Sequence, residues 1–162
     1  MNAGPVEGPR AAVITISTSK ARGEGADESG PALAAFAERV GARVVDIEVI
    51  PDERELIEGR LRWWCDEGGC ELLLTTGGTG FAPSDVTPEA TRAVIDREAP
   101  GLAEAMRLVS PPGRLSRAVA GTRGETLVLN TPGSPTGAVE CLYAVLDVVP
   151  HALDLLTGGR PH

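Results

Sequence analysis

Two aspartates and a run of glycines carry the chemistry that this sequence could perform. The segment Gly77-Gly78-Thr79-Gly80 follows the apolar run 72–76 and precedes Asp85. Because glycine has no Cβ, such a loop can bring backbone N–H groups close to a phosphate. Asp85 could bind a divalent cation beside that phosphate, and a carboxylate that only caps backbone amides is an equally good interpretation. The loop therefore predicts an anion site without saying which anion it binds.

Asp52 has the same two interpretations, because it lies where an apolar strand pattern, 43–50, gives way to a helical pattern. Its carboxylate could accept N–H groups from the first turn of that helix. If Asp52 and Asp85 converge across neighbouring strand ends, they could hold Mg²⁺ against a triphosphate. A bound cation would explain how a chain with a net charge of −8 binds a polyanion.

The common phosphate-binding signatures are absent from the sequence. No G-x-x-x-x-G-K-[ST] motif occurs, and Lys20, which is the only lysine, lies in a different context, so the chain is not a P-loop enzyme. Pro83 stands where a dinucleotide-binding fingerprint needs its third glycine, which argues against ordinary Rossmann binding. The acidic balance and the scattered arginines argue against a nucleic-acid partner.

The remaining composition predicts a single cytoplasmic domain. No apolar run approaches the roughly 20 residues of a membrane span, and residues 1–9 resemble a flexible tail more than a secretory signal. We place the domain at residues 10–162, which is an ordinary size for one hydrophobic core. The cysteine spacing matches neither a CxxC pair nor a zinc knuckle, and we interpret these residues as buried and apolar. Both histidines lie near the C-terminus, and no Cys and His pair for nucleophilic catalysis is evident; these residues are Cys65, Cys70, Cys141, His151 and His162.

The pattern of the chain also predicts the scaffold that must position the aspartates. Apolar runs at 11–17, 43–50 and 72–76 alternate with helical patterns, which is typical of a parallel sheet. A hairpin is predicted later, at 118–122 and 126–129. We therefore expect an α/β protein, a three-layer α/β/α sandwich whose mostly parallel central sheet gains an antiparallel hairpin strand late in the chain.

Two local expectations concern the segments beside the candidate site. Thr87 as N-cap and Pro88 as first helical residue predict a helix that runs to about Arg97. Residues 18–25 are polar and contain glycine, which predicts a loop.

In a parallel sheet, ligands bind where the carboxyl ends of the strands lead into loops. The loops expected there are rich in Gly, Ser, Thr or Asp, and they comprise residues 17–27, 51–52, 77–85 and 131–135. Ser134, in the segment Pro-Gly-Ser-Pro, could donate a hydrogen bond to a phosphate or simply form a turn. The sequence therefore predicts one site at one edge of the sheet.

The same segments resemble the MogA and MoaB family of molybdenum cofactor biosynthesis, which includes the gephyrin G domain and its plant counterpart. The resemblance covers about residues 11–156, with its segments in the right order. It rests on Thr75–Gly80 with Asp85–Thr91, on Ser17–Ser19 with Asp27–Pro31, on Leu115–Arg117 and on Pro132–Pro135.

The resemblance implies a homotrimeric nucleotidyltransferase that uses Mg²⁺ and ATP to adenylylate molybdopterin, giving adenylyl-molybdopterin and pyrophosphate. It also implies that Asp52 and Asp85 are the catalytic acids, which we expect to bind Mg²⁺. Contacts to the substrate and nucleotide are then expected from Ser17, Ser29, Thr76, Gly77, Gly78, Thr79, Gly80, Ser116, Gly133 and Ser134. The partners are small molecules, without nucleic acid or membrane, and a molybdate-inserting enzyme of the MoeA type would act downstream.

Two other functions remain open at this point. Some members of the MoaB branch are suspected of lacking adenylylation activity, so the chain could be a non-catalytic pterin-binding protein. The presence of both aspartates and both glycine-containing loops favours the enzyme. The MoeA type uses a related domain within a much longer chain, which argues against molybdate insertion by this chain alone.

Overall fold

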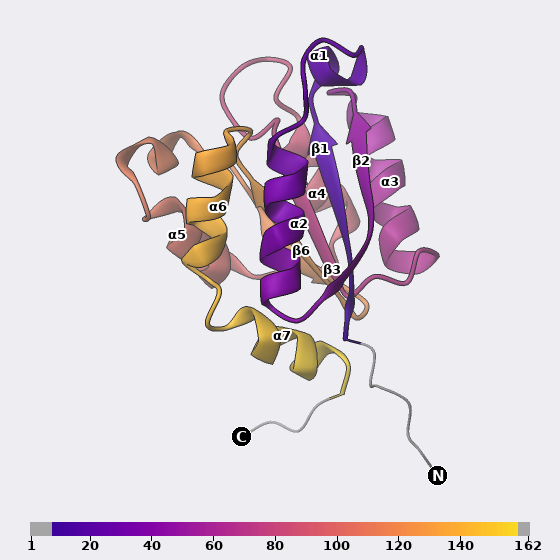
Figure 1. Cartoon of the computed structure of the whole chain (residues 1–162). Coiled ribbons are helices and arrows are strands. Elements are labelled where there is room, and N and C mark those ends of the chain that lie inside the picture. The colour runs from indigo at the N-terminus through magenta and orange to yellow at the C-terminus, as the bar shows by residue number, and fades with distance from the viewer. Residues whose placement is uncertain (1–7, 159–162) are drawn as a thin grey trace.

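The computed structural model describes residues 8–158, which form a three-layer α/β/α sandwich (Figure 1). The tail predicted at residues 1–9 lies outside the described residues except for Gly8 and Pro9, and so does His162. In chain order the elements are β1 (Arg10–Ile16), α1 (Thr18–Ala21), α2 (Ser29–Arg39), β2 (Arg43–Ile50), α3 (Arg54–Asp66), β3 (Leu72–Thr76), α4 (Thr87–Val94), β4 (Arg97–Glu98), α5 (Pro100–Arg107), the 3₁₀ helix η1 (Pro111–Leu115), β5 (Ala120–Arg123), β6 (Thr126–Thr131), α6 (Pro135–Tyr143) and α7 (Val149–Leu156).

The six described strands form one sheet in the order β2-β1-β3-β6-β5-β4. The pairs β1 with β2, β1 with β3, and β3 with β6 are parallel, whereas β5 pairs antiparallel with both β6 and β4. Thr15 is in register with Thr76, and Thr76 with Thr131, so these strands end at the same edge of the sheet. This edge is the one that the sequence predicts for the ligand loops.

Side chains of β1 alternate between two hydrophobic cores, one on each face of the sheet. Val13 belongs to the core that contains Leu33 of α2 and Leu142 of α6. Its neighbour Ile14 belongs to the core that contains Ile57 of α3. Figure 1 shows α2 in front of the sheet and α4 behind it. The central strands β1, β3 and β6 are buried on both faces and rich in apolar residues, and the sequence pattern identified them correctly.

Three local predictions were wrong, and for the first of them a long-range contact overrides the local pattern. The helix that was expected to reach Arg97 ends at Val94, since Asp96 N–H donates to Thr122 O and the pair 97–98 adds a further antiparallel strand beside β5. Val86, and not Thr87, is the N-cap of α4. The polar segment expected as a loop contains the helical turn α1, whose N-cap Ser17 accepts a hydrogen bond from Lys20 N–H.

None of the helices that the structure describes combines the length and the apolarity needed to cross a bilayer.

Candidate active site

Loops from four strand ends converge on one cavity of about 220 Å³, which we call the strand-end cavity. It lies at the carboxyl ends of β1, β2, β3 and β6, at the top of Figure 1. Its lining combines carboxylates, hydroxyls, glycines and one ammonium group: Thr15, Ile16, Ser17, Lys20, Asp52, Thr76, Gly77, Gly78, Asp85 and Gly133. Asp52 and Asp85, whose convergence the sequence leaves as a condition for binding Mg²⁺, therefore line the same cavity.

Asp52 is held by hydrogen bonds with Thr18 of α1 and does not cap α3, the helix that follows it in the chain. Its Oδ2 accepts hydrogen bonds from Thr18 N–H (3.0 Å) and Thr18 Oγ1 (2.9 Å), and Asp52 N–H donates to the same hydroxyl (3.0 Å). The N-cap of α3 is Glu53, which makes no side-chain cap. The expected capping of α3 by Asp52 is wrong, because α1 offers its own unsatisfied N–H groups nearby. These contacts occupy Oδ2 and leave Oδ1 beside Gly78.

Asp85 is positioned by a turn within its own loop. Its Oδ2 accepts a hydrogen bond from Ala82 N–H at 3.0 Å, and the backbone N–H of Asp85 donates to Ala82 O at 2.9 Å. The side chain is half-buried and lines the strand-end cavity. The capping role and the cation-binding role that the sequence left open are therefore compatible in one residue, because a carboxylate has about four acceptor sites.

Two glycines allow the loop to pass close to these carboxylates. A Cβ on Gly78 would lie 3.1 Å from Asp52 Oδ1 and 2.3 Å from Thr87 Oγ1, and its φ of +69° is one that other residues rarely adopt. A Cβ on Gly80 would lie 2.9 Å from Asp85 Oδ2. The glycine pattern thus serves to bring backbone against the two acids.

The backbone amides available for a phosphate are fewer than the sequence indicates. Gly77 N–H donates to Thr131 O at 3.0 Å and so continues the pairing of β3 with β6. Among residues 8–158, the N–H groups of Gly78, Thr79 and Gly80 have no hydrogen-bond acceptor. The predicted phosphate cradle therefore narrows to these three amides.

Lys20 is a functional candidate that the sequence analysis did not select. It was considered only as a P-loop lysine and rejected, yet α1 brings it into the lining of the strand-end cavity. A lysine is a compact cation suited to phosphate oxygens. Its position as the only lysine of an acidic chain, within a predicted ligand loop, was the signal that could have identified it.

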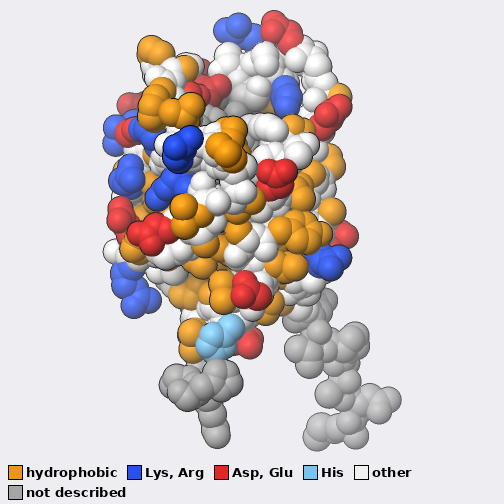
Figure 2. All heavy atoms as spheres, turned by 90° about the vertical axis from the view of Figure 1, so that its left-hand side faces the viewer, with side chains coloured by type: hydrophobic (Ala, Val, Ile, Leu, Met, Phe, Trp, Pro, Cys, Tyr) orange, Lys and Arg blue, Asp and Glu red, His pale blue; other side chains and the backbone are white. Residues whose placement is uncertain are grey.

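A second cavity, of about 370 Å³, lies between α5, η1 and α6, and we call it the α5–α6 cavity. Ser116 and Ser134, both predicted contacts, line it together with Asn130 and Pro132. Figure 2 shows the side of the molecule that carries α5 and α6, where hydrophobic side chains are spread among charged ones. The predicted site residues that line a cavity therefore divide between two cavities, and the segment 130–134 contributes to the lining of both.

Three predicted contact residues line neither of these two cavities. Ser29 is fully buried and its Oγ donates to Gly133 O at 2.8 Å. Thr79 is also buried, and its carbonyl accepts Arg117 N–H at 2.8 Å. Gly80 borders Asp85 as described above. Thr76, which does line the strand-end cavity, donates from Oγ1 to Pro132 O at 2.7 Å. Ser29 and Thr76 thus hold the segment 132–133 in place.

The donor set of the strand-end cavity fits magnesium better than a transition metal. Asp52, Asp85 and Ser17 provide oxygen atoms only, and Mg²⁺ is commonly bound by one or two carboxylates with phosphates and waters completing its shell. No group of three or more His, Cys, Asp or Glu side chains that could hold a metal ion occurs in the described part of the chain.

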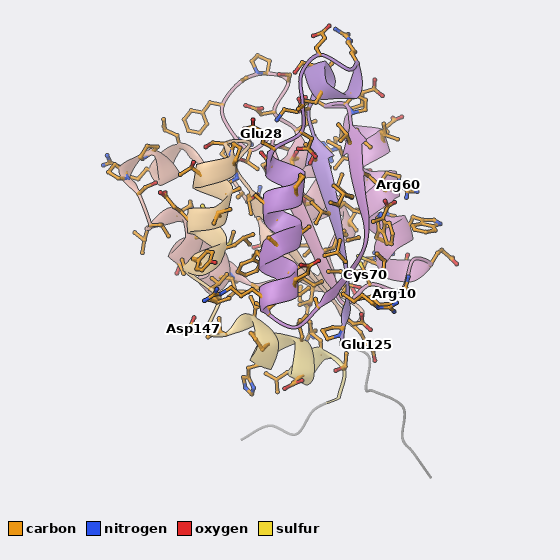
Figure 3. The ribbon with its side chains drawn as sticks, in the orientation of Figure 1. Arg10, Glu28, Arg60, Cys70, Glu125 and Asp147 are labelled. Atoms are coloured by element: carbon orange, nitrogen blue, oxygen red, sulfur yellow. The ribbon has the colours of Figure 1, made fainter. Side chains whose placement is uncertain are left out.

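None of the three cysteines lines the strand-end cavity, whereas Cys141 lines the α5–α6 cavity. Cys70 is buried at the amino end of β3, far from the strand-end loops (Figure 3), and burial raises the pKa of its thiol to about 12. Burial likewise raises the pKa of Cys65 to about 11. Such thiols are protonated at neutral pH and poorly nucleophilic. The interpretation of the cysteines as buried apolar residues is confirmed for Cys70, whereas Cys65 and Cys141 are only partly buried.

Comparison with known proteins points to one family. Residues 12–151 match the family model described as a probable molybdopterin binding domain. The molybdopterin adenylyltransferase of Escherichia coli K12 is 40% identical over 167 residues, which cover 92% of this chain and 86% of that protein. The enzyme of the same name from Helicobacter pylori J99 is 47% identical over 116 residues, or 69% of this chain. The match spans about two thirds (66%) of the Helicobacter protein.

Solved structures agree with this result. The molybdopterin biosynthesis enzyme MoaB of Thermus thermophilus superposes with a TM-score of 0.89 at 51% identity, covering 94% of this chain and 98% of that one. The molybdopterin biosynthesis Mog protein of Mycobacterium ulcerans superposes with a TM-score of 0.85 at 39% identity, covering 93% and 98%.

Proposed function

This chain belongs to the family of probable molybdopterin binding domains, and from this membership we propose that it is a molybdopterin adenylyltransferase. The observation that carries the proposal is the meeting of Asp52, Asp85 and the glycine loop at one cavity. Two acids in a cavity whose described lining includes no cysteine or histidine suit a transfer between phosphates, which needs no covalent enzyme intermediate. The same geometry gives no specific support to a non-catalytic pterin-binding protein.

In the proposed reaction, a phosphate oxygen of molybdopterin attacks the α-phosphorus of ATP. A bond forms between that oxygen and the α-phosphorus, and the bond from the α-phosphorus to the oxygen bridging to the β-phosphate breaks. Pyrophosphate leaves with the electron pair, and the products are adenylyl-molybdopterin and pyrophosphate. Such a reaction requires mainly positioning and neutralisation of charge from the protein.

The residues of the strand-end cavity and of the glycine loop beside it divide this work between them. The amides of Gly78, Thr79 and Gly80 donate to phosphate oxygens, and Lys20 adds a positive charge beside them. Asp52 and Asp85 hold Mg²⁺ or orient the waters bound to it. When bound, Mg²⁺ neutralises the phosphate charge that accumulates during transfer. Ser17 and Gly133 border the same space and complete the contact surface.

The α5–α6 cavity is the proposed place for a ring system of one of the substrates. Its volume of about 370 Å³ lies within the usual range for small-molecule pockets. Ser116 and Ser134 provide hydroxyls at its wall. Because Pro132 lines one cavity and Gly133 lines the other, the proposed ligand extends a ring into the first and a phosphate into the second.

The wider setting follows from the family resemblance and forms part of the same proposal. The protein is a cytoplasmic homotrimer, and its product passes to a molybdate-inserting enzyme of the MoeA type. Exposed hydrophobic side chains of the segment 108–115, on the side seen in Figure 2, support an assembly of subunits; they are Leu108, Val109 and Leu115.

Transfer of the adenylyl group by purified protein tests the proposal. We expect the wild type, given molybdopterin, ATP and Mg²⁺, to form adenylyl-molybdopterin, and Asp52→Asn and Asp85→Asn each to slow this by orders of magnitude, since each loses a carboxylate proposed to bind the cation. Asp147→Asn, an exposed aspartate away from the strand-end loops (Figure 3), serves as control and should react at the wild-type rate.

Near-native rates in both site variants would refute the roles assigned to the two acids. If the wild type binds molybdopterin tightly but forms no product, the chain is instead a non-catalytic pterin-binding protein.

A further inference from the structure

Arg117 connects the two ends of the loop that carries Asp85. Its Nε donates to Gly80 O at 2.8 Å, and its Nη2 donates to Asp85 O at 2.8 Å. Its backbone N–H donates to Thr79 O, also at 2.8 Å. One residue therefore contacts the first and the last residue of the turn 80–85, in which Asp85 receives Ala82 N–H.

The third arm of the same guanidinium reaches the helix behind the loop. Nη1 of Arg117 forms an ion pair with Glu89, which lies in the first turn of α4. The hydrogen bond from Arg117 lowers the pKa of the Glu89 carboxyl below its usual value, so the pair remains charged at neutral pH. The loop is thus tied to a helix that is itself anchored by Thr87, whose Oγ1 donates to Gly77 O.

Arg117 also lies next to the second cavity. It follows directly after Ser116, the C-cap of η1, which lines the α5–α6 cavity. The carboxylate of Asp85 lines the strand-end cavity. Ser116 and Arg117 therefore connect the wall of the α5–α6 cavity to the loop that carries Asp85 in the strand-end cavity.

We propose that Arg117 is a positioning residue that sets the backbone of Gly80 and Asp85, and so the direction in which the Asp85 carboxylate meets Mg²⁺ and the phosphates. This inference rests on the proposed function. Arg117 itself does not line the strand-end cavity and acts through its contacts with the loop.

The geometry requires arginine and not merely a positive charge. A planar guanidinium presents several donors in a rigid fork, and here three of its nitrogens reach three different acceptors. A lysine ammonium is a single point on a flexible stem and cannot span Gly80, Asp85 and Glu89 in the same way. Arg117→Lys therefore keeps the charge and removes the positioning.

The test compares Arg117→Lys with a matched control, Arg123→Lys. Arg123 also forms a fork, with Asp66 (2.9 and 2.8 Å) and with Val94 O (2.8 Å), but it lies in the β5–β6 hairpin at the opposite edge of the sheet. Three properties are measured: the Mg²⁺ dependence of adenylyl transfer, the Mg²⁺ dependence of binding of a non-hydrolysable ATP analogue by calorimetry, and amide hydrogen exchange over residues 79–85.

For Arg117→Lys we expect the Mg²⁺ requirement to rise about 10- to 100-fold, as is usual when the groups that orient metal-binding residues are lost. Exchange over residues 79–85 should accelerate while that of the sheet stays unchanged. Arg123→Lys should lower the unfolding temperature and leave the Mg²⁺ requirement at the wild-type value. Glu89→Gln leaves the contacts of Arg117 with Gly80 O and Asp85 O in place, so it should raise the Mg²⁺ requirement less than Arg117→Lys does. It is the variant to use if Arg117→Lys does not fold.

A wild-type Mg²⁺ requirement and wild-type loop exchange in Arg117→Lys would overturn the proposal. An equal rise in the Mg²⁺ requirement in Arg123→Lys would also overturn it, because the effect would then be general loss of structure. If the wild type transfers no adenylyl group, the proposed function fails, while analogue binding and loop exchange still decide whether Arg117 positions Asp85.

Discussion

Asp52 and Asp85 each use one carboxylate oxygen to hold their own loop. Oδ2 of Asp52 accepts two hydrogen bonds from Thr18, and Oδ2 of Asp85 accepts one from Ala82. The same contact that satisfies a loop amide thereby orients the side chain, so the remaining acceptor sites point in a defined direction. Sequence analysis treated capping and cation binding as alternatives, whereas the structure gives each residue the geometry for both.

Gly78 should not tolerate a side chain, because a Cβ there would press on the groups that surround Asp52. Gly78→Ala forces a Cβ to within 2.3 Å of Thr87 Oγ1 and 3.1 Å of Asp52 Oδ1, at a φ that costs alanine roughly 1–2 kcal/mol before any clash. We expect a lower midpoint in denaturant unfolding and weaker binding of Mg²⁺ with an ATP analogue.

Gly59→Ala, within α3, provides the control for this prediction. A Cβ there meets nothing within 4 Å, so it should raise stability slightly, by about 0.5–1 kcal/mol. If Gly78→Ala unfolds at the wild-type midpoint, the close approach inferred at this position is wrong.

At the scale of elements, the site depends on how strands and helices are tied at their ends. Thr87 N–H donates to Gly78 O and its Oγ1 donates to Gly77 O, so α4 begins directly on the glycine loop. Asn130 of β6 connects three elements at once: its Nδ2 donates to Thr75 Oγ1 of β3 and Thr91 Oγ1 of α4, and its Oδ1 accepts Val119 N–H before β5. These ties give the loops a rigid base.

Asn130→Leu should destabilise the protein, because Val119 N–H and the hydroxyls of Thr75 and Thr91 lose their hydrogen bonds to the Asn130 side chain. Asn130 is buried, and a buried polar group that loses its hydrogen bond costs about 1–3 kcal/mol. With about 2–4 °C per kcal/mol for a domain of this size, we expect the unfolding temperature to fall by roughly 5–10 °C in a calorimetric scan.

Thr157→Val is the matched control, because it removes hydrogen bonds to Leu153 O and Asp154 O at the end of α7, where the residue is exposed. Its effect should stay below about 1 kcal/mol. An unfolding temperature for Asn130→Leu equal to that of this control would contradict the central role assigned to Asn130.

At the scale of the whole molecule, the protein is acidic, yet the charged groups proposed to bind its ligand lie together at the carboxyl edge of the sheet. The chain carries a net charge of −8 and only one lysine, and that lysine lines the strand-end cavity together with the two acids. The hydrophobic cores occupy the faces of the sheet, which leaves its carboxyl edge free for polar loops. In the proposed function, binding of a polyanion therefore depends on local groups and a cation, not on the overall field.

Nucleotide should therefore stabilise the whole protein only when Mg²⁺ is present. A ligand that binds the folded state at 100 times its Kd adds about 2.7 kcal/mol of stability. We expect ATP with Mg²⁺ to raise the unfolding temperature in a thermal-shift measurement, and EDTA to abolish the rise. Asp52→Asn should show little rise under either condition, whereas an equal rise with EDTA would argue against a metal held by these acids.

The sequence by itself determined the parallel strands, the loops at their carboxyl ends and the two acids within those loops. This was possible because β1 and β3 are buried on both faces, so they appear as mainly apolar runs that end at the glycine and aspartate segments. Only the tertiary structure decided which atoms meet across long separations. Thr18 and Asp52 lie 34 positions apart and Gly80 and Arg117 lie 37 apart, and the short strand 97–98 exists only because β5 offers it an edge. No local pattern encodes such pairings, because they form when the folded sheet brings distant backbone donors and acceptors together.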